Sequence, residues 1–295
     1  MPLYRTLLFA PGNHPRRIEK ALGLGADAVI LDLEDSVPPA EKAATRASVA
    51  QALAQRRSCR GYVRVNAMGT PYCYGDLVAA VANGVDGVVL PKVESAADLH
   101  AIDWLIANLE RERGLQVGAL DLIPIIETAW GVSRIERILQ ARTLKPYSGV
   151  WRVRRVAFGA ADLSTDLGIS PAPDEAELEY ARARVVLASR AGGLEGPLDS
   201  PWFRLKDADG YRAAIARSRR AGFQGRLCIH PDQVGPANEG YAPTADEIAA
   251  AERIVAAFRA AEASGAAAIQ VDGQMVDYPI AQRAERLLKA VKGER

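Results

Sequence analysis

The chain has 295 residues, of which 49% are hydrophobic, and this length allows either two domains or one α/β barrel of about 250 residues with an addition. Its formal net charge of +1 gives no electrostatic footprint for a nucleic acid or an anionic membrane surface. We therefore expect neither a nucleic acid nor a membrane as its partner.

Apolar runs and helical segments alternate along the chain. The runs that predict strands lie at residues 4–9, 28–33, 61–65, 86–90, 121–127, 154–159, 194–199 and 224–229. Helices are predicted after them, among them residues 15–24, 39–55, 74–83, the segment from the N-cap Ser95 to 113, and 208–221. Eight strand–helix units in unbroken order predict an α/β protein with a closed (β/α)8 TIM barrel.

The last part of the chain has a different pattern. A helix is predicted over residues 244–264 and another over 279–291. Between them, two short apolar pieces flank Asp272-Gly273, which is a type I′ hairpin signal. We expect residues 1–240 to form the TIM barrel catalytic domain and residues 241–295 a C-terminal helix–hairpin–helix appendage.

Two carboxylates stand at the ends of neighbouring predicted strands. Glu127 follows the apolar run 121–126, and Asp162 ends the run that begins at Arg155. Each alone is equally well explained as an acid that caps a helix N-terminus. The carboxyl ends of barrel strands meet at one mouth, however, where active sites form.

Further polar residues are predicted at the same mouth. They are Asp32, Glu34, Asp35, Arg64, Asn66 and Lys92. This excess of acids over cations is costly unless a positive ion lies among them. The sequence thus predicts Mg²⁺ bound by Glu127 and Asp162, with positions left for water and substrate oxygens. The alternative is that these are surface acids in flexible loops.

Cysteine usage and the N-terminus indicate the compartment. Cys59, Cys73 and Cys228 form no CxxC pair and leave an odd thiol, so neither a disulfide framework nor a zinc site is indicated. The apolar run at residues 6–10 is too short for a signal-peptide core. We expect an unprocessed, cytoplasmic protein.

A set of short motifs resembles a known family over essentially the whole chain. They are residues 8–12 (LFAPG), 25–37 (GADAVILDLEDSV), 64–66 (RVN), 90–92 (LPK), 126–128 (IET), 159–162 (GAAD), 166–168 (DLG), 228–233 (CIHPDQ) and 275–279 (MVDYP). In this order the set resembles the citrate lyase β-subunit family of the HpcH/HpaI aldolase/citrate lyase superfamily, which is similar to malyl-CoA and citramalyl-CoA lyases.

The resemblance implies a carbon–carbon lyase that cleaves or forms a 3-hydroxyacyl thioester carried by coenzyme A or an acyl carrier protein. It implies Mg²⁺ at Glu127 and Asp162, a substrate-facing Arg64, and a homotrimer or hexamer. It also implies that the appendage is a lid on a neighbouring subunit, where Asp277 is the acid/base. Alternatively, Asp277 is only the N-cap of the helix that Pro279 opens.

These roles match the chemistry of the residue types. An arginine keeps its charge beside the thioester oxygen, where enolate charge develops. A carboxylate is needed to move a proton. Glu34 and Asp35 with Lys42 are expected to orient the metal-bound waters, although Lys42 is equally consistent with a solvated helix residue.

One departure from the family pattern concerns the substrate. Much of the family has a Glu-Asp pair where this chain has Ala161-Asp162. Asp162 still supplies a carboxylate, but the change leaves the identity of the oxo acid open.

Two other functions compete with the thioester lyase. One is a metal-dependent aldolase that acts on free 2-oxo acids and needs neither Asp277 nor the appendage. The other is a catalytically silent subunit, for which a retained acid pair has no use. A phosphate-binding barrel is disfavoured because the last predicted strand is followed by residues 230–233 (HPDQ) rather than a glycine-rich loop.

Overall fold

The computed structural model describes residues 4–143, 146–147 and 149–292. The chain divides into two compact units, Tyr4–Tyr241 and a second that begins at Ala242. Among the helices of the described residues, none combines the length and apolar character that crossing a membrane requires.

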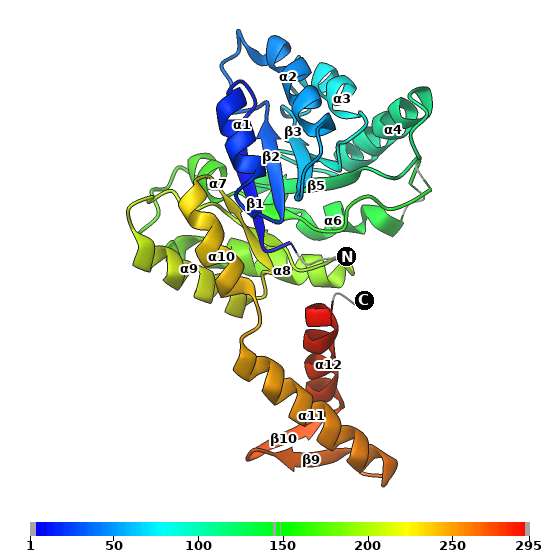
Figure 1. Ribbon diagram of the computed structural model, residues 1–295, viewed down its shortest axis with the longest axis vertical. Coiled ribbons are helices and arrows are strands. Elements are labelled where there is room, and N and C mark those ends of the chain that lie inside the picture. Colours follow the sequence, from blue (N-terminus) through cyan, green and yellow to red (C-terminus); the bar gives the residue numbers. More distant parts are fainter. Residues whose placement is uncertain (1–3, 144–145, 148, 293–295) are drawn as a thin grey trace. The chain divides into compact units, whose positions relative to one another are not determined.

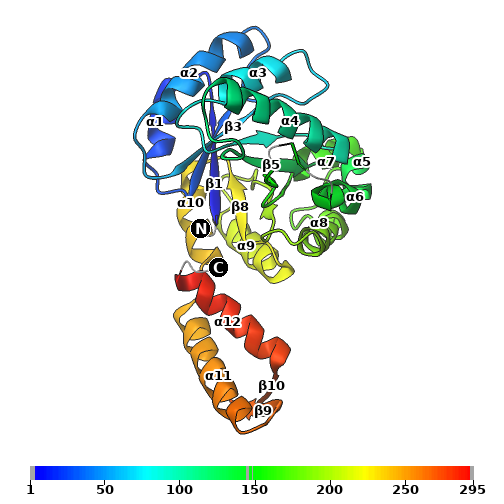
Figure 2. The same ribbon diagram turned by 90° about the vertical axis from the view of Figure 1, so that its right-hand side faces the viewer.

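The first unit is a closed barrel of eight parallel strands (Figures 1 and 2). The strands are β1 (Thr6–Pro11), β2 (Ala28–Asp32), β3 (Arg60–Arg64), β4 (Gly87–Leu90), β5 (Asp121–Ile126), β6 (Ala157–Phe158), β7 (Leu198–Asp199) and β8 (Gly225–Cys228). Each strand pairs with the next in sequence, and β8 closes the ring on β1. The predicted (β/α)8 barrel is confirmed.

Helices surround the strands in this unit. They are α1 (Pro15–Leu22), α2 (Lys42–Ala54), α3 (Cys73–Ala80), α4 (Ala96–Glu112), α5 (Ala129–Ser133), α6 (Ile135–Leu139), α7 (Ala160–Asp166), α8 (Glu179–Ala191), α9 (Ala208–Ala221) and α10 (Val234–Tyr241). Short 3₁₀ turns are η1 (Gln140–Thr143), η2 (Ala176–Leu178) and η3 (Pro231–Gln233). Ser95 caps α4 as predicted, because its hydroxyl accepts from the Asp98 amide while Asp98 accepts from the Ser95 amide.

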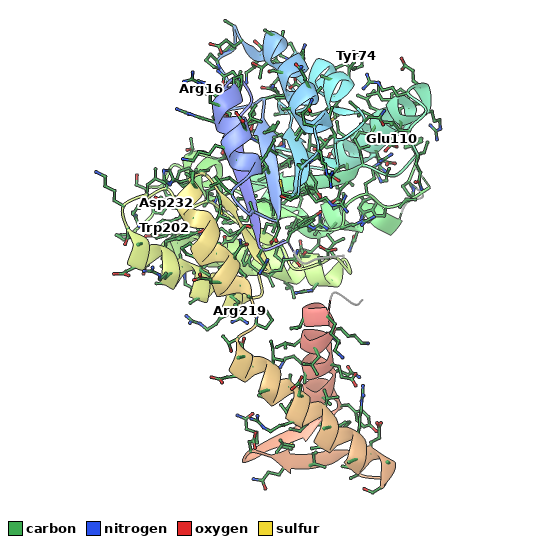
Figure 3. All side chains as sticks on the ribbon, in the orientation of Figure 1. Arg16, Tyr74, Glu110, Trp202, Arg219 and Asp232 are labelled. Carbon is green, nitrogen blue, oxygen red and sulfur yellow. The ribbon has the colours of Figure 1, made fainter. Side chains whose placement is uncertain are left out.

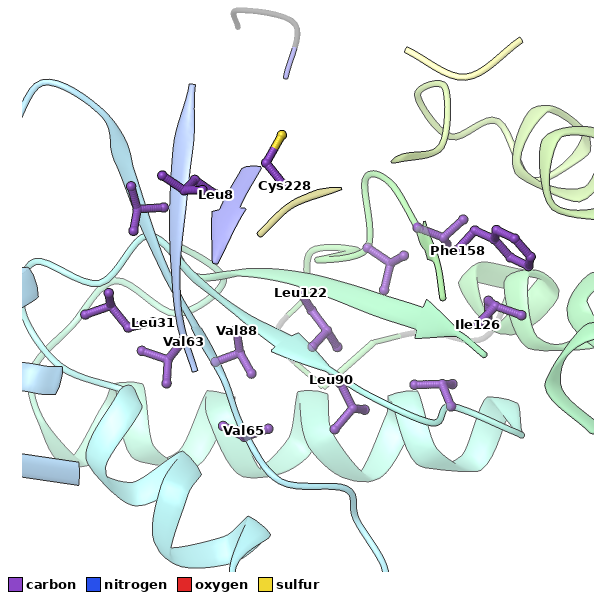
Figure 4. Packing of buried hydrophobic residues seen from close by; sticks show 14 of the residues in the cluster. Leu8, Leu31, Val63, Val65, Val88, Leu90, Leu122, Ile126, Phe158 and Cys228 are labelled. Atoms are coloured by element: carbon purple, nitrogen blue, oxygen red, sulfur yellow. The ribbon is translucent and has the colours of Figure 1, made fainter. Parts of the chain in front are cut away.

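Alternate residues of each strand face two separate apolar layers. Ala28 and Ile30 of β2 lie in a cluster inside the barrel, whereas Leu31 and Val63 belong to a larger cluster between the strands and the helices. Figure 4 shows members of this outer cluster, including Leu31, Val63 and Leu90. Fully burying a side chain of this size contributes ~1.5–3 kcal/mol, so the two layers hold the strand ends in fixed positions.

Two strands are shorter than the sequence predicts. β6 and β7 contain only Ala157–Phe158 and Leu198–Asp199, where longer runs were expected. Pro197 has no amide hydrogen to donate to a ladder, which limits β7 at its start. The preceding backbone still bonds across the gap, since the Glu195 amide donates to the Arg154 carbonyl at 2.9 Å.

The second unit is a helix–hairpin–helix, as predicted. α11 (Ala245–Ala263) and α12 (Tyr278–Lys292) flank the antiparallel strands β9 (Ala268–Val271) and β10 (Gln274–Asp277). The turn residues Asp272 and Gly273 have φ of 51° and 81°, as a type I′ turn requires. Phe258, Val276 and Ala281 form part of its own small core.

Candidate active site

A pocket of about 390 Å³ lies at the carboxyl ends of the barrel strands. Its lining includes Asp32, Asp35, Arg64, Glu127 and Asp162 from four different strand ends. All five were predicted at the barrel mouth, and they share one cavity.

Arg64 is held in the pocket by strand register and by charge. Asp32 and Arg64 are directly paired between β2 and β3, so Nε and Nη2 of Arg64 donate to the two oxygens of Asp32, each at 2.7 Å. Nη1 of Arg64 lies 3.0 Å from the Glu34 carboxylate, and the guanidinium stacks on Phe9 with 4.8 Å to the ring centroid. Burial opposes the charge of Arg64, but Asp32 and then Glu34 raise its pKa above the usual value. Arg64 is thus a permanent cation of fixed orientation.

Lys92 connects three carboxylates through two of its groups. Its ammonium lies 2.7 Å from Glu34 and 3.3 Å from Asp162, and its backbone amide donates to Oε1 of Glu127 at 2.9 Å. Its backbone is left-handed, with φ of 52°, which is rare for a residue that is not glycine. Such strain persists where surrounding contacts hold it, and here the contacts are those of the site.

Glu127 is almost completely buried, with 3% of its surface exposed. Gly159 at the N-terminus of α7 packs against it, so that a Cβ at position 159 would lie 2.4 Å from Oε2 of Glu127. Burial, followed by repulsion from Asp162 and Glu34, raises the pKa of Glu127 to about 8. A nearby cation would favour the ionised form of this carboxyl group.

Asp162 lies in the first turn of α7 and is half-buried. The last residue of the same helix, Asp166, accepts a hydrogen bond from the Ala129 amide at 2.7 Å. α5 begins at Ala129, and its N-cap Thr128 accepts from the Gly131 amide at 3.0 Å. The bond to Asp166 therefore ties the helix that carries Asp162 to the segment that follows Glu127.

The donor set fits a hard divalent cation. Among the described residues no three His, Cys, Asp or Glu side chains form a metal-binding group. Mg²⁺ nevertheless needs only one or two carboxylates, because it keeps several waters and substrate oxygens. This pocket and its ion pairs contain two cations, Arg64 and Lys92. They are outnumbered by the carboxylates of Asp32, Glu34, Asp35, Glu127 and Asp162.

Two expected site residues have other contacts. Lys42 is buried rather than solvated, and its ammonium donates to the backbone carbonyls of Leu33 and Glu34 at 2.9 and 2.6 Å. It thus holds the loop that carries Glu34 and Asp35. Asp277 belongs to the second unit, where its Oδ1 accepts from the Ile280 amide at 3.2 Å, as an N-cap would.

The sequence analysis placed Asp32 and Lys92 at the barrel mouth without a role in the chemistry, and it gave Gly159 no place in the site. The first two carried a usable signal, because both stand at the ends of apolar runs. Asn66, also expected at the mouth, is buried and its amide donates to Leu33 and Asp76, so it braces the loop.

The comparison with known families is decisive for the whole barrel. Residues 5–231 match the model of HpcH/HpaI aldolase/citrate lyase. The chain belongs to this family. The predicted resemblance is therefore confirmed.

Curated relatives cover nearly the full chain. Citrate lyase subunit beta of Leuconostoc mesenteroides subsp. cremoris is 37% identical over 97% of this chain and 93% of its own length. L-malyl-CoA/beta-methylmalyl-CoA lyase of Cereibacter sphaeroides is 33% identical, also over 97% of this chain and 93% of its own length.

Solved structures are similar too. CitE from Mycobacterium tuberculosis in complex with magnesium, acetoacetate and coenzyme A has a TM-score of 0.78 and 31% identity, with 98% of each chain covered. The citrate lyase beta subunit from M. tuberculosis complexed with oxaloacetate and magnesium has a TM-score of 0.67 and 30% identity over 81% of this chain and 96% of its own.

Proposed function

We propose that this protein is a Mg²⁺-dependent carbon–carbon lyase that cleaves or forms a 3-hydroxyacyl thioester of the citryl-, malyl- or citramalyl-CoA type. The observation that carries the proposal is the pairing, in one pocket, of Glu127 and Asp162 with the oriented guanidinium of Arg64. Its relatives are named citrate lyase subunit beta and malyl-CoA lyase, and they match the second unit as well as the barrel.

Glu127 and Asp162 would hold the metal. When bound there, Mg²⁺ polarises the oxygen that becomes the carbonyl of the leaving oxo acid. Lys92 places its amide on Glu127 and its ammonium on Asp162, which fixes both carboxylates in position. Glu34 and Asp35, positioned by Lys42, bracket Arg64 from the β2–α2 loop.

Arg64 acts on the thioester half of the substrate. In cleavage the C2–C3 bond breaks, its electron pair moves into the thioester enolate, and the 3-hydroxyl loses its proton. A guanidinium beside the thioester oxygen stabilises the developing charge, and its orientation by Asp32 means that no reorganisation is needed at that moment. The enolate carbon then takes a proton, which we assign to Asp277 of a neighbouring subunit.

The assembly follows from that assignment. We propose residues 1–240 as the catalytic domain and residues 241–295 as a lid in a homotrimer or hexamer, with a thioester on coenzyme A or an acyl carrier protein. The three cysteines are free thiols, which supports a reducing, cytoplasmic location.

Calorimetry with Mg²⁺, combined with turnover of malyl-, citramalyl- and citryl-CoA, tests the proposal. Glu127→Ala/Asp162→Ala should lose both Mg²⁺ binding and turnover. Arg64→Lys is the matched variant: it should bind Mg²⁺ like the wild type yet turn over ~10²-fold more slowly, because an ammonium lacks the planar donor fork. Unchanged Mg²⁺ binding in the double variant would contradict the metal site. Turnover of free 2-oxo acid aldols, without any thioester cleavage, would favour the aldolase alternative.

A further inference from the structure

A second cavity of about 160 Å³ adjoins the active pocket. It lies between α7 and the segment after β7, which carries Trp202 (labelled in Figure 3). The two cavities share Ala161 and Phe203 in their linings. Ala161 is exposed, so the α7 side of this junction carries only a methyl group, opposite the ring of Phe203 in the shared lining.

Of the polar groups in the walls of this side pocket, those of Ser164, Glu175 and Arg204 have partners, whereas the buried Nε1 of Trp202 has none among the described residues. The Ser164 hydroxyl donates to the Ala160 carbonyl at 2.7 Å, and the Glu175 carboxylate is paired with Arg182. Arg204 donates to the Pro173 carbonyl and lies over the Trp202 ring, 5.4 Å from its centroid. The remaining walls are apolar and include Pro171 and Leu178. A ligand group meets mostly apolar walls here and gains most by being apolar, because the one unpartnered indole donor offers a polar group little compensation for the loss of its water.

The far wall is preformed rather than loose. Glu175 has a left-handed backbone, with φ of 54°, and Arg182 binds both its carbonyl and its carboxylate. Arg182 is itself buried and paired with Asp199 at 3.1 Å. A segment anchored to the barrel in this way keeps the side pocket open before any ligand enters.

The position of Ala161 decides which part of a substrate would enter. Its chain neighbour is Asp162, one of the two carboxylates proposed to hold the metal at the oxo-acid half, whereas Arg64 serves the thioester half. We propose that the side pocket beyond Ala161 binds an apolar chain on the oxo-acid fragment, so that the preferred oxo acid is a 2-oxo acid longer than pyruvate. This inference rests on the proposed function and deepens it.

The chemical step remains balanced for such a substrate. In cleavage the C2–C3 bond breaks, the hydroxyl at C3 becomes the ketone of a 2-oxo acid, and the released proton is matched by the one taken up at the enolate carbon. The apolar chain on C3 takes no part in the bond changes. It contributes binding only, at about fourfold per buried methylene.

Binding of 2-oxo acids to the Mg²⁺-loaded protein, measured by calorimetry, tests this without needing turnover. Wild-type affinity should rise about fourfold per methylene from pyruvate to 2-oxobutanoate to 2-oxopentanoate. Ala161→Leu should abolish this increase, so that the longer acids bind no better than pyruvate to the same variant. Leu178→Ala, which deepens the pocket from its far side, should extend the increase to 2-oxohexanoate. Ala213→Leu is the control, because it makes the same change at an exposed alanine of α9 that lines neither cavity.

The outcomes separate the two proposals. The side pocket would be overturned if wild-type affinity stays constant or falls with chain length, or if affinity rises equally in Ala161→Leu and the wild type. Either result would count even if thioester cleavage is observed. A rising series that Ala161→Leu flattens would uphold the side pocket even if no thioester is cleaved. The ratio of turnover for 3-hydroxyacyl-CoA substrates with propyl and methyl groups on C3 should change in the same sense in each variant.

Discussion

Gly159→Ala probes the metal site without touching a proposed ligand. Gly159 has φ of −112° and ψ of 97°, which alanine adopts freely. The hydrogen bond that its backbone amide donates to the Ile126 carbonyl, at 3.1 Å, would remain. The new methyl group, however, would lie 2.4 Å from Oε2 and 2.6 Å from Cβ of Glu127. The main effect of the change is thus a steric clash with Glu127.

The severity of this clash determines the expected loss of stability and turnover. Ordinary contact begins near 3.4 Å, so the carboxylate must move by about 1 Å. Rotation of the carboxylate alone cannot relieve the contact with Cβ, and part of the strain must pass into β5 and β6. Overpacking of this kind costs ~1–3 kcal/mol of stability. A 1 Å displacement of a positioning group costs ~10²-fold in turnover.

Mg²⁺ calorimetry, thermal unfolding and thioester turnover should be measured together. Gly235→Ala is the control, because its added methyl meets nothing within 4 Å and lies in α10. The control should retain turnover and gain slight helix stability. Wild-type Mg²⁺ affinity and turnover in Gly159→Ala would refute the placement of Glu127 as a ligand.

The barrel was predictable because its signals are local. Each strand is a buried run followed by a helix. The residue types of Ser95 and of Asp272-Gly273 alone predict a helix cap and a hairpin turn. Two features were not local. No range was assigned to α10, since Gly235, Pro236 and Gly240 give it little helix propensity. The shortness of β6 and β7 depends on backbone pairing that residue type does not specify.

The site was predictable as a gathering of charges but not as a set of pairs. The pairing of Asp32 with Arg64 follows from the β2–β3 register. The left-handed Lys92 and the burial of Lys42 depend on loop geometry. The side pocket beyond Ala161 requires residues 171, 178 and 202 to meet, and no sequence pattern joins them.

Two further predictions concern stability and assembly. Burial opposes ionisation of Asp86, but hydrogen bonds from the Gly61 amide and from Arg60 and Arg57 hold the pKa of its carboxyl below the usual value. Its contribution to stability is therefore present above the unfolded-state pKa of ~3.9 and is lost as pH falls below it. In urea unfolding, Asp86→Asn should flatten this acid limb and the exposed Asp209→Asn should not; equal slopes would contradict the assignment. The assembly prediction starts from Asp277, which lies in the second unit. If Asp277 serves a neighbouring barrel, Asp277→Asn and Glu127→Ala subunits, each inactive alone, should regain part of the activity when mixed and reassembled, because some mixed sites combine an intact Glu127 with an intact Asp277. Asparagine can still accept from the Ile280 amide, so folding should be spared while proton transfer is lost. A fully active monomer would exclude the arrangement, and mixed oligomers that stay inactive would leave Asp277 acting within its own chain or only capping α12.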